Sequence, residues 1–463
     1  MSYISKGVEK FVETAISIIE SVSIEEALHV ASFLGEVLWK NSVGIYQLAK
    51  IELALVERFE SLIPSVSDKR ICRFAHVLTK AYDTGGHTRL VERLVATKSL
   101  EDSRVLVTHA TAPVAYERLS RAFHGCTVLL RAPKPETRLA SLVAAFSQCE
   151  VLILYVHPYD IESVVAAGIA KRRSGVRVLF FNHADHVFSW GYGVADRILE
   201  ISHYGWALRQ KRRCENRSVF VGIPLELPNV LVAKPALMPL PHGVVMAAGT
   251  AYKFRPTQSW SFPKFIQSLC QSAECDVAVV GPNVWCDWWW WPALLILKKR
   301  LNIRSRLEYD DYLVLMSKAV AFVDSFPLAG GTAFAEIISR GVPGFGVLTG
   351  SHGYSPADLV KSASLTTLLD DLVNFIATGK RAGVDDSDLY ARIHEVHDKE
   401  AVASRILGAV SGSGIDEPPP WPCTVNVDIA YFERIWVARR FPIMPVHMVP
   451  PLSLLLPFLR LKE

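Results

Sequence analysis

The strongest chemical signal in the sequence is a glycine-rich turn between a predicted strand and a predicted helix. The strand ends in FVDS, the turn holds Gly330 and Gly331, and a helical pattern starts at Thr332. A helix start offers free backbone N–H groups and a partial positive charge, and glycines let a phosphate come close. We therefore expect these three residues to bind a diphosphate. Glu336 follows one turn later, where it would accept hydrogen bonds from ribose hydroxyls or merely complement the helix dipole.

A second group of candidate phosphate ligands lies in GTAYKFRP, which follows the first predicted strand of the C-terminal half. Lys253 and Arg255 would neutralise phosphate charge, because a fixed cation stabilises a phosphoryl leaving group as its charge develops. A solvated surface lysine is the alternative interpretation. Asn283 follows another predicted strand of the same half. Ligands of open parallel sheets bind beyond the carboxyl ends of the strands, so we group it with the donor-binding residues.

Two histidine-bearing segments are candidates for activation of an acceptor. YDTGGHTRLVERL places His87 at a predicted helix start behind paired glycines, where an imidazole can remove an acceptor proton, donate to phosphate or simply cap the helix. FFNHADHVFSWGYG places His183, Asp185 and His186 after a predicted strand. No HExxH or CxxC pattern accompanies this cluster, so we assign no metal. His87, His183 and Asp185 are our catalytic or positioning candidates.

Two further clusters each allow more than one interpretation. NVWCDWWWWP contains five tryptophans, which would form a sugar-stacking or membrane-interface platform or else pack in the core. EYDD at 308–311 superficially matches an acidic metal-binding motif. Its register is not Asp-x-Asp, and carboxylates are common at strand ends, so we assign it no metal either.

These residues need parallel sheets to position them. Short apolar runs alternate with helical patterns from about residue 71 and again from about residue 240, which predicts two α/β halves with strands buried on both faces. The region before them predicts helices, either as a cap on the first half or as a dimerisation or acceptor-docking element. The expected division is a helical region at 1–68, an acceptor domain at 69–238, a donor domain at 239–410 and a tail at 411–463, for which a return to the first domain is one interpretation.

Length and composition narrow the class of protein. A chain of 463 residues exceeds a single core, which stops growing at about 250 to 300 residues. A formal net charge of +4, with both signs spread along the chain, gives no reason to expect a nucleic-acid partner. The eight cysteines form no CxxC pair and the first residues lack a signal-peptide pattern, which predicts a cytoplasmic location. No apolar stretch reaches the ~18 residues of a membrane span, although the tail PLSLLLPFLRLKE leaves peripheral membrane contact as a second interpretation.

Four blocks, taken in order, resemble the protein O-linked N-acetylglucosamine transferases and the related adhesin glucosyltransferases, a branch of the GT-B enzymes. The blocks are DTGGHTRL, FNHADHVFSWGYGVADRILEIS, AGTAYKFRP and DSFPLAGGTAFAEIISRGVP, within about residues 75–350. The resemblance implies a bacterial-type glycosyltransferase with two Rossmann-like domains facing a cleft. It also implies a UDP-sugar donor, inversion at the anomeric carbon and no metal or other cofactor.

The same resemblance assigns roles to single residues. It implies that Lys253 binds the donor diphosphate, Thr332 a phosphate and Glu336 the ribose, while His87 lies in the catalytic cleft. The family's His-Thr-Thr turn reads Gly-Thr-Ala here, so one imidazole and one hydroxyl are missing. No tetratricopeptide repeat is found in the sequence. We expect transfer of a hexose or N-acetylhexosamine to a protein side chain; assembly of lipopolysaccharide or another surface glycan, and a non-catalytic scaffold, are the alternatives.

Overall fold

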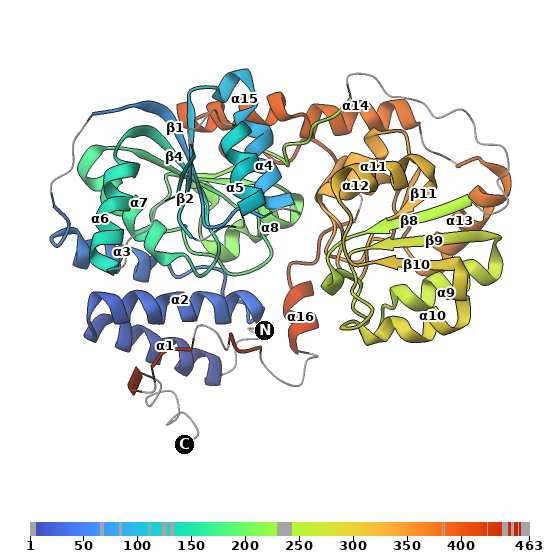
Figure 1. Cartoon of the computed structure of the whole chain (residues 1–463), viewed down its shortest axis with the longest axis horizontal. Helices are drawn as coiled ribbons and strands as arrows, with labels where there is room; N and C mark the ends of the chain where they lie inside the picture. The colour runs from blue at the N-terminus through green and yellow to red at the C-terminus, as the bar shows by residue number, and fades with distance from the viewer. Residues whose placement is uncertain are drawn as a thin grey trace.

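The chain folds into two α/β halves that lie side by side, with the N-terminal helices against the first half (Figure 1). The computed structural model describes residues 6–64, 69–82, 86–109, 111, 113–122, 127–129, 134–228, 243–381, 383, 385–423, 425–437, 443–445, 449–451 and 453–454. Residues 83–85 of the DTGG block and the expected domain boundary near 239 therefore lie outside the described residues.

The first half is built on a seven-stranded sheet in the order β3-β2-β1-β4-β5-β6-β7, with every pairing parallel. In its central strands β1 and β4 every residue except the second is buried, as is typical of a parallel sheet with helices on both faces. The strands are β1 (Cys72–Leu78), β2 (Ser103–Val107), β3 (Thr127–Leu129), β4 (Cys149–Tyr155), β5 (Arg177–Phe181), β6 (Arg197–Glu200) and β7 (Ser218–Phe220). The helices are α4 (Gly86–Val95), α5 (Pro113–Ala122), α6 (Pro135–Phe146), α7 (Ile161–Ser174) and α8 (His203–Arg212).

The second half repeats this plan on a smaller scale. Its five-stranded sheet has the order β10-β9-β8-β11-β12 and is also parallel throughout. The strands are β8 (Gly243–Ala248), β9 (Cys275–Val280), β10 (Leu301–Arg304), β11 (Ala319–Val323) and β12 (Gly344–Phe345). The helices are α9 (Phe262–Ser272), α10 (Trp291–Leu297), α11 (Tyr309–Lys318), α12 (Thr332–Ser339), α13 (Leu365–Thr378) and α14 (Asp386–His397). Two parallel α/β halves were predicted, and the structure confirms them.

The N-terminal helices are α1 (Lys6–Ser21), α2 (Ile24–Lys40) and α3 (Ala49–Glu60). They pack on the first half, where α2 contacts α6 and α7, and α3 contacts α7. Gly35 permits the close approach of α2, because a Cβ there would overlap the backbone carbonyl of Pro158. The packed cap is therefore the interpretation that the structure supports for this region.

The chain returns to the first half after α14. Helix α15 (Lys399–Ser411) packs against α4, ahead of the boundary expected at 411. The link between α14 and α15 pairs with the first half, since Leu225 donates its N–H to the carbonyl of His397 at 2.7 Å and accepts one from Lys399 at 3.1 Å. Helix α16 (Tyr431–Val437) then joins both halves. The Tyr431 hydroxyl donates to the Pro327 carbonyl of the second half at 2.8 Å, and Glu433 accepts from Lys211 of the first half at 2.9 Å.

No helix among the described residues is long and apolar enough to cross a bilayer.

The close approach of α2 to the first half can be tested by adding a single methyl group. Gly35→Ala would place its Cβ against the Pro158 carbonyl, so we expect a loss of about 1–3 kcal/mol in the free energy of unfolding, measured with urea. Gly408→Ala in α15 is the matched control, since its Cβ would meet only the flexible hydroxyl of Ser413 at 2.8 Å. Equal stability of the two variants would show that α2 is not held at this distance.

Candidate functional site

The glycine-rich turn connects β11 to α12 and is supported from beneath by a buried charge cluster. Both oxygens of the Asp324 carboxylate accept the Gly330 N–H, at 3.0 and 3.2 Å, and the Lys361 ammonium lies 2.7 Å from Oδ2. Lys361 also pairs with Asp358 at 2.5 Å. Burial raises the pKa of Asp324, and Lys361 opposes that shift. A Cβ at position 330 would overlap Asp324 Oδ1, so glycine is required here, and its amide is already in use.

Lys253 lies directly beside this turn, although the two segments are far apart in the sequence. It belongs to a short 3-10 helix, η3 (Ala251–Phe254), which follows β8. Its Nζ donates to the carbonyl of Ala329 at 3.2 Å, and its own carbonyl accepts the N–H of Leu328 at 3.4 Å. Helix α12 begins at Thr332 with no side chain capping it. Lys253 thus lies beside the turn that leads into an uncapped helix start, and both an ammonium group and free backbone N–H groups attract an anion.

The start of α4 in the first half faces the start of α12 in the second. A Cβ at Gly86 would lie 3.3 Å from the Thr332 hydroxyl, so the two helix starts meet across the boundary between the halves. Each helix start carries a partial positive charge, and bringing two together favours a negative charge beside them. The space between these two positions is too narrow for a phosphate in this state.

Glu336 in α12 is engaged by the first half. The Arg93 guanidinium, from α4, donates to both of its carboxylate oxygens at 3.2 Å, and Arg340 lies 3.7 Å away. Arg93 also donates to the carbonyl of Pro224 at 3.2 Å. Glu336 therefore joins the two halves, and binding ribose would require it to share oxygens that Arg93 already uses. The ribose role stays a prediction.

His87 lies in a cluster of imidazole rings at the strand ends of the first half. Its ring centroid is 4.4 Å from that of His183 and 5.1 Å from that of His157. Nε2 of His87 donates to the Tyr155 carbonyl at 3.0 Å, while Nδ1 is buried and has no hydrogen-bond partner among the described residues. Burial lowers the pKa of His87 to about 4. His87 is therefore neutral at pH 7 with a lone pair on Nδ1, the form that a general base requires.

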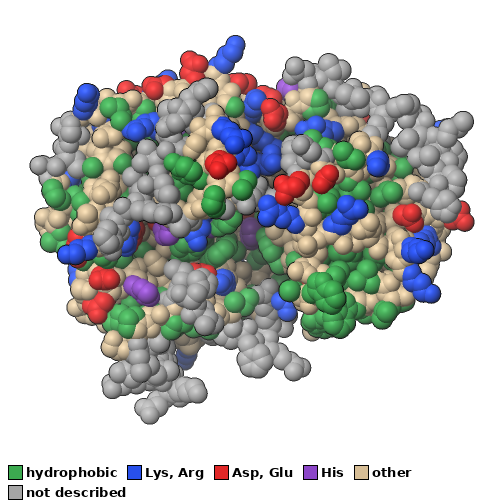
Figure 2. Space-filling model, viewed as in Figure 1, with side chains coloured by type: hydrophobic (Ala, Val, Ile, Leu, Met, Phe, Trp, Pro, Cys, Tyr) green, Lys and Arg blue, Asp and Glu red, His purple; other side chains and the backbone are tan. Residues whose placement is uncertain are grey.

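The other two rings of the cluster are also neutral. Burial lowers the pKa of His157 to about 3 and holds the pKa of His183 well below its usual range. The Tyr82 hydroxyl lies 3.0 Å from Nε2 of His157. Among the described residues, no group of three His, Cys, Asp or Glu side chains is placed to hold a metal ion. Figure 2 shows a histidine side chain in the hollow between the two halves.

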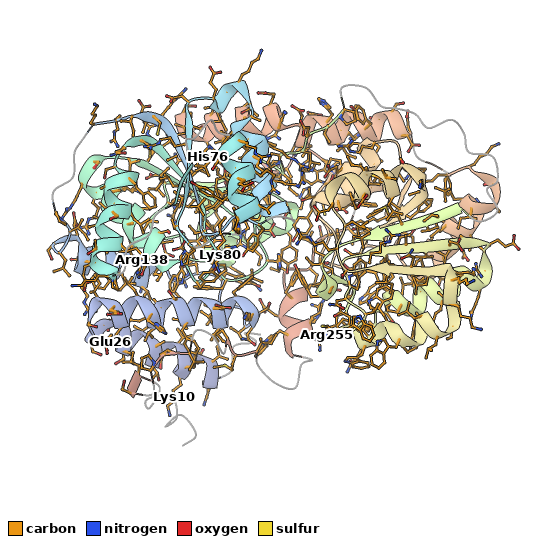
Figure 3. The ribbon with its side chains drawn as sticks, in the orientation of Figure 1. Lys10, Glu26, His76, Lys80, Arg138 and Arg255 are labelled. Atoms are coloured by element: carbon orange, nitrogen blue, oxygen red, sulfur yellow. The ribbon has the colours of Figure 1, made fainter. Side chains whose placement is uncertain are left out.

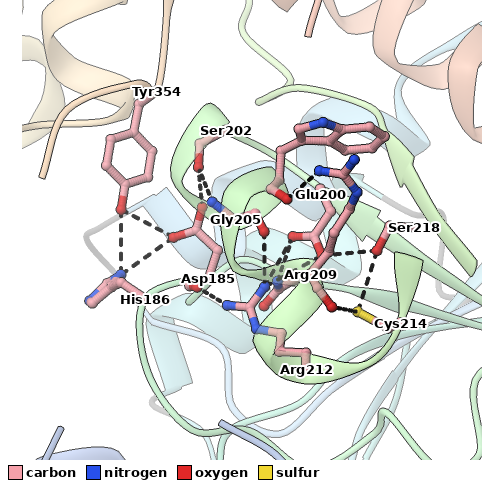
Figure 4. A network of polar contacts seen from close by, with 12 residues as sticks. Asp185, His186, Glu200, Ser202, Gly205, Arg209, Arg212, Cys214, Ser218 and Tyr354 are labelled. Atoms are coloured by element: carbon pink, nitrogen blue, oxygen red, sulfur yellow. Dashed lines mark hydrogen bonds and ion pairs between the residues drawn. The ribbon is translucent and has the colours of Figure 1, made fainter. Parts of the chain in front are cut away.

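Asp185 lies at the centre of a buried polar network rather than on an open surface (Figure 4). The Ser202 hydroxyl donates to one carboxylate oxygen, and the Tyr354 hydroxyl, from the second half, donates to the other at 3.1 Å. Nδ1 of His186 lies 3.4 Å from the oxygen that Tyr354 contacts. These bonds give Asp185 a structural function in joining the halves, and its predicted catalytic function stays a prediction.

The same network contains an ion pair that solvent does not reach. Glu200 and Arg212 are 3.4 Å apart with both side chains fully buried. Asn182 donates to the Glu200 carboxylate at 2.7 Å, and Arg212 donates to the backbone carbonyl of Asp185. Burial raises the pKa of Glu200, which Arg212 partly offsets. This pair fixes the loop that carries His183 and Asp185.

Arg255 and Asn283 lie at the edge of the second half, and Figure 3 shows Arg255 on the side nearer the first half. The Arg255 guanidinium carbon is 5.4 Å from the centre of the Trp289 ring. Asn283 accepts the N–H of Trp285 at 3.1 Å through its side-chain oxygen, which closes a local turn. Both side chains therefore contact the tryptophan segment, while Lys253 contacts the glycine-rich turn.

Three residues that organise this site had no role assigned from the sequence. Arg93 lies in the block that drew attention to His87, but nothing in the sequence indicated a partner 243 positions away. Tyr354 binds Asp185 from a loop that we did not single out. His157 was visible as a polar residue after β4, and its place at a strand end was the available signal.

The comparisons with known proteins concern the fold. No protein-family model matches the sequence, and no curated protein matches it. Among solved structures, Anabaena HepE (Alr3699) in complex with UDP and glucose is similar with a TM-score of 0.55 and 13% identity, over 74% of this chain and 100% of that chain. A glycosyltransferase from Rickettsia africae is similar with a TM-score of 0.53 and 8% identity, again over 74% and 100%. At these identities the similarity shows the fold, and it confirms the predicted GT-B architecture.

A third structure concerns the resemblance seen in the sequence. A mutant of the Thermobaculum terrenum O-GlcNAc transferase aligns over 93% of this chain and 83% of that chain, with 13% identity and a TM-score of 0.46. The resemblance to this particular branch therefore stays a prediction.

Removing the buried Arg212 should lower the free energy of unfolding far more than removing an exposed arginine. Arg212→Ala leaves the Glu200 carboxylate buried without its cation, so we expect a loss of about 3–5 kcal/mol in the free energy of unfolding. The control is Arg172→Ala, whose guanidinium is 50% exposed and 3.3 Å from Glu60, and there we expect about 0–1 kcal/mol. Urea unfolding followed by circular dichroism measures both. Similar losses would mean that the pair does not stabilise the fold.

Because the buried histidines are neutral in the folded chain, the free energy of unfolding should decrease as the pH falls. The pKa of His87 is about 4 in the folded chain against 6.5 in the unfolded chain, so only the unfolded state takes up a proton as pH falls below 6.5. The free energy of unfolding should therefore decrease from pH 6.5 towards pH 4 and be constant with respect to this group above pH 6.5.

Two histidine variants separate this effect from general acid sensitivity. We expect His87→Gln to have a shallower decrease between pH 6.5 and 5, because the depressed group is gone. The exposed His29 is the control, and His29→Gln should keep the slope of the original chain. Urea unfolding at several pH values gives the slopes, and identical slopes for all three proteins would contradict a buried neutral His87.

Proposed function

We propose that this chain is a glycosyltransferase that moves a hexose or N-acetylhexosamine from a UDP-sugar to an acceptor. The observation that carries the proposal is the contact of Lys253 with Ala329 in the glycine-rich turn, which leads into the uncapped start of α12. A UDP leaving group develops negative charge as the glycosidic bond breaks. An ammonium group and oriented amides already in place stabilise that charge without a metal.

The donor end of the proposal draws on the fold. A similar structure, HepE, is described in complex with UDP and glucose. In this architecture a ligand occupies the crevice beyond the carboxyl ends of the strands. Lys253 follows β8, and Thr332 follows the turn after β11, so both lie at that edge of the second sheet. We assign the diphosphate to these two residues. Glu336 would bind the ribose through carboxylate oxygens that also accept hydrogen bonds from Arg93.

The acceptor end rests on His87. Its Nδ1 has a free lone pair among the described contacts, and the Tyr155 carbonyl fixes the proton on Nε2. In the proposed reaction Nδ1 takes the proton of the acceptor hydroxyl while the acceptor oxygen bonds to the anomeric carbon and UDP leaves. A single displacement of this kind inverts that carbon. No cofactor is needed for these steps.

The acceptor is either a protein side chain or a growing lipopolysaccharide or surface glycan, and one observation favours the glycan. The resemblance in the sequence favours a protein side chain. The exposed Trp285, Trp288 and Trp291 favour the second candidate, assembly of lipopolysaccharide or another surface glycan, since such acceptors are held at a membrane. A scaffold without activity is the remaining alternative, and it predicts neither donor binding nor turnover.

Replacing Lys253 tests the donor site. Lys253→Ala removes a charge-assisted contact to phosphate, so we expect UDP to bind about 10- to 100-fold more weakly by calorimetry. Lys264→Ala is the matched control because this exposed lysine lies on α9 of the same half. Lys253→Arg keeps the positive charge and should retain part of the affinity. Unchanged UDP affinity in Lys253→Ala would exclude the proposed diphosphate site.

Binding alone does not distinguish an enzyme from a scaffold. Incubation of the chain with UDP-glucose, UDP-galactose and UDP-N-acetylglucosamine, followed by measurement of released UDP, should show slow hydrolysis of at least one donor. We expect His87→Gln to lower this rate while leaving UDP affinity unchanged. UDP binding without any turnover, with or without protein and glycan acceptors, would favour the scaffold.

A further inference from the structure

The second half carries a patch of large apolar side chains that face solvent. The fractional exposures are 86% for Trp285, 66% for Trp288, 51% for Trp291, 76% for Leu295 and 55% for Ile296. Figure 2 shows hydrophobic side chains gathered on the lower part of this half. Large aromatic and aliphatic side chains are normally buried, and a contiguous exposed set marks an interaction surface. We call these five residues the tryptophan patch.

The patch lies on a segment that is apolar on both sides. The segment comprises the turn that holds Trp285, then η4 (Trp288–Trp290) and α10. Its inward positions Trp290, Ala293 and Leu297 are buried in the core of the second half. A surface helix of a soluble domain normally pairs such an inner face with a polar outer face. Here the outer face is apolar as well, so it matches an apolar environment outside the chain.

Local hydrogen bonds hold the patch in one shape. The indole N–H of Trp291 donates to the Val284 carbonyl at 2.7 Å. The Asn283 carbonyl accepts the N–H groups of Cys286 at 2.9 Å and Asp287 at 2.7 Å. The side chains are therefore presented by an ordered turn and helix, which lowers the entropy that binding would cost.

The exposed charged residues of the segment that carries the patch are of one sign. Within 283–299 the exposed charged residues are Lys298 and Lys299, which directly follow α10. The acidic residue of this segment, Asp287, is buried and accepts the N–H of Asn283 at 2.7 Å. Indoles combine an apolar ring with a polar N–H and concentrate at the interface between water and lipid, and lysines beside them attract anionic headgroups.

We propose that the tryptophan patch binds the surface of an anionic lipid bilayer, inserting Trp285, Trp288 and Leu295 at headgroup depth while Lys298 and Lys299 contact the headgroups. This inference does not depend on glycosyl transfer. The same segment includes Trp289, whose ring lies against the Arg255 guanidinium. A bilayer is favoured over a second copy of the chain, since a symmetric contact would bring the lysines of both copies together.

Vesicle co-sedimentation tests the proposal with the full chain. We expect binding to vesicles of phosphatidylglycerol and phosphatidylcholine, weaker binding to phosphatidylcholine alone, and a loss of the difference at high salt. The triple variant Trp285→Ser, Trp288→Ser, Leu295→Ser should bind at least about tenfold more weakly. Its unfolding temperature and UDP affinity should be unchanged, which separates this proposal from the proposed function.

The control variant replaces exposed apolar side chains by serine on another part of the surface. Leu53→Ser with Leu62→Ser removes two apolar side chains that are 50% and 57% exposed on the first half, and vesicle binding should be retained. Lys299→Glu should weaken binding to the anionic vesicles alone. Equal vesicle binding by the triple variant and the original chain would overturn the proposal. A second result would also overturn it: the original chain binds no vesicles and forms a dimer in size-exclusion chromatography, and the triple variant does not form that dimer.

Discussion

The site depends on polar groups that neither half can bury alone. Glu336 in the second half is nine-tenths buried, and its carboxylate is matched by Arg93 from the first half. Asp185 in the first half is fully buried, and Tyr354 from the second half donates to it. A buried carboxylate without a partner is strongly unfavourable. The two contacts therefore hold the halves in one relative position, and that position brings the start of α4 to the start of α12.

The sheets explain why the candidate residues come from separate parts of the chain. All strands within each sheet are parallel, so their carboxyl ends and the turns that follow lie at one edge. His87, His157 and His183 follow different strands of the first sheet and still come into ring contact. Lys253 and the glycine-rich turn meet in the same way at the edge of the second sheet. The contacts between the halves then bring these two edges towards each other.

Much of the architecture could be predicted because it follows from local patterns. Apolar runs such as VLILY identified strands buried on both faces, and the helix that starts at Thr332 follows from the turn before it. The proximity of Lys253 to that turn was predictable from strand ends. The partner of Glu336 was not, because a carboxylate early in a helix fits ribose binding, dipole compensation and an ion pair equally well. Burial of Asp185 depends on Tyr354, whose position is set by the packing of the whole second half.

The charge beneath the glycine-rich turn defines how the site can bind a diphosphate. Asp324 and Asp358 flank the Lys361 ammonium, and Lys253 lies close enough to lower the pKa of Asp324. Two carboxylates and two ammonium groups sum to no net charge. Attraction for an anion must therefore come from oriented groups: the amides at the start of α12 and the Lys253 ammonium, which now donates to the Ala329 carbonyl. Exchange of that neutral acceptor for a phosphate oxygen strengthens the bond without uncovering any buried charge, so the site can stay stable when empty and still bind an anion.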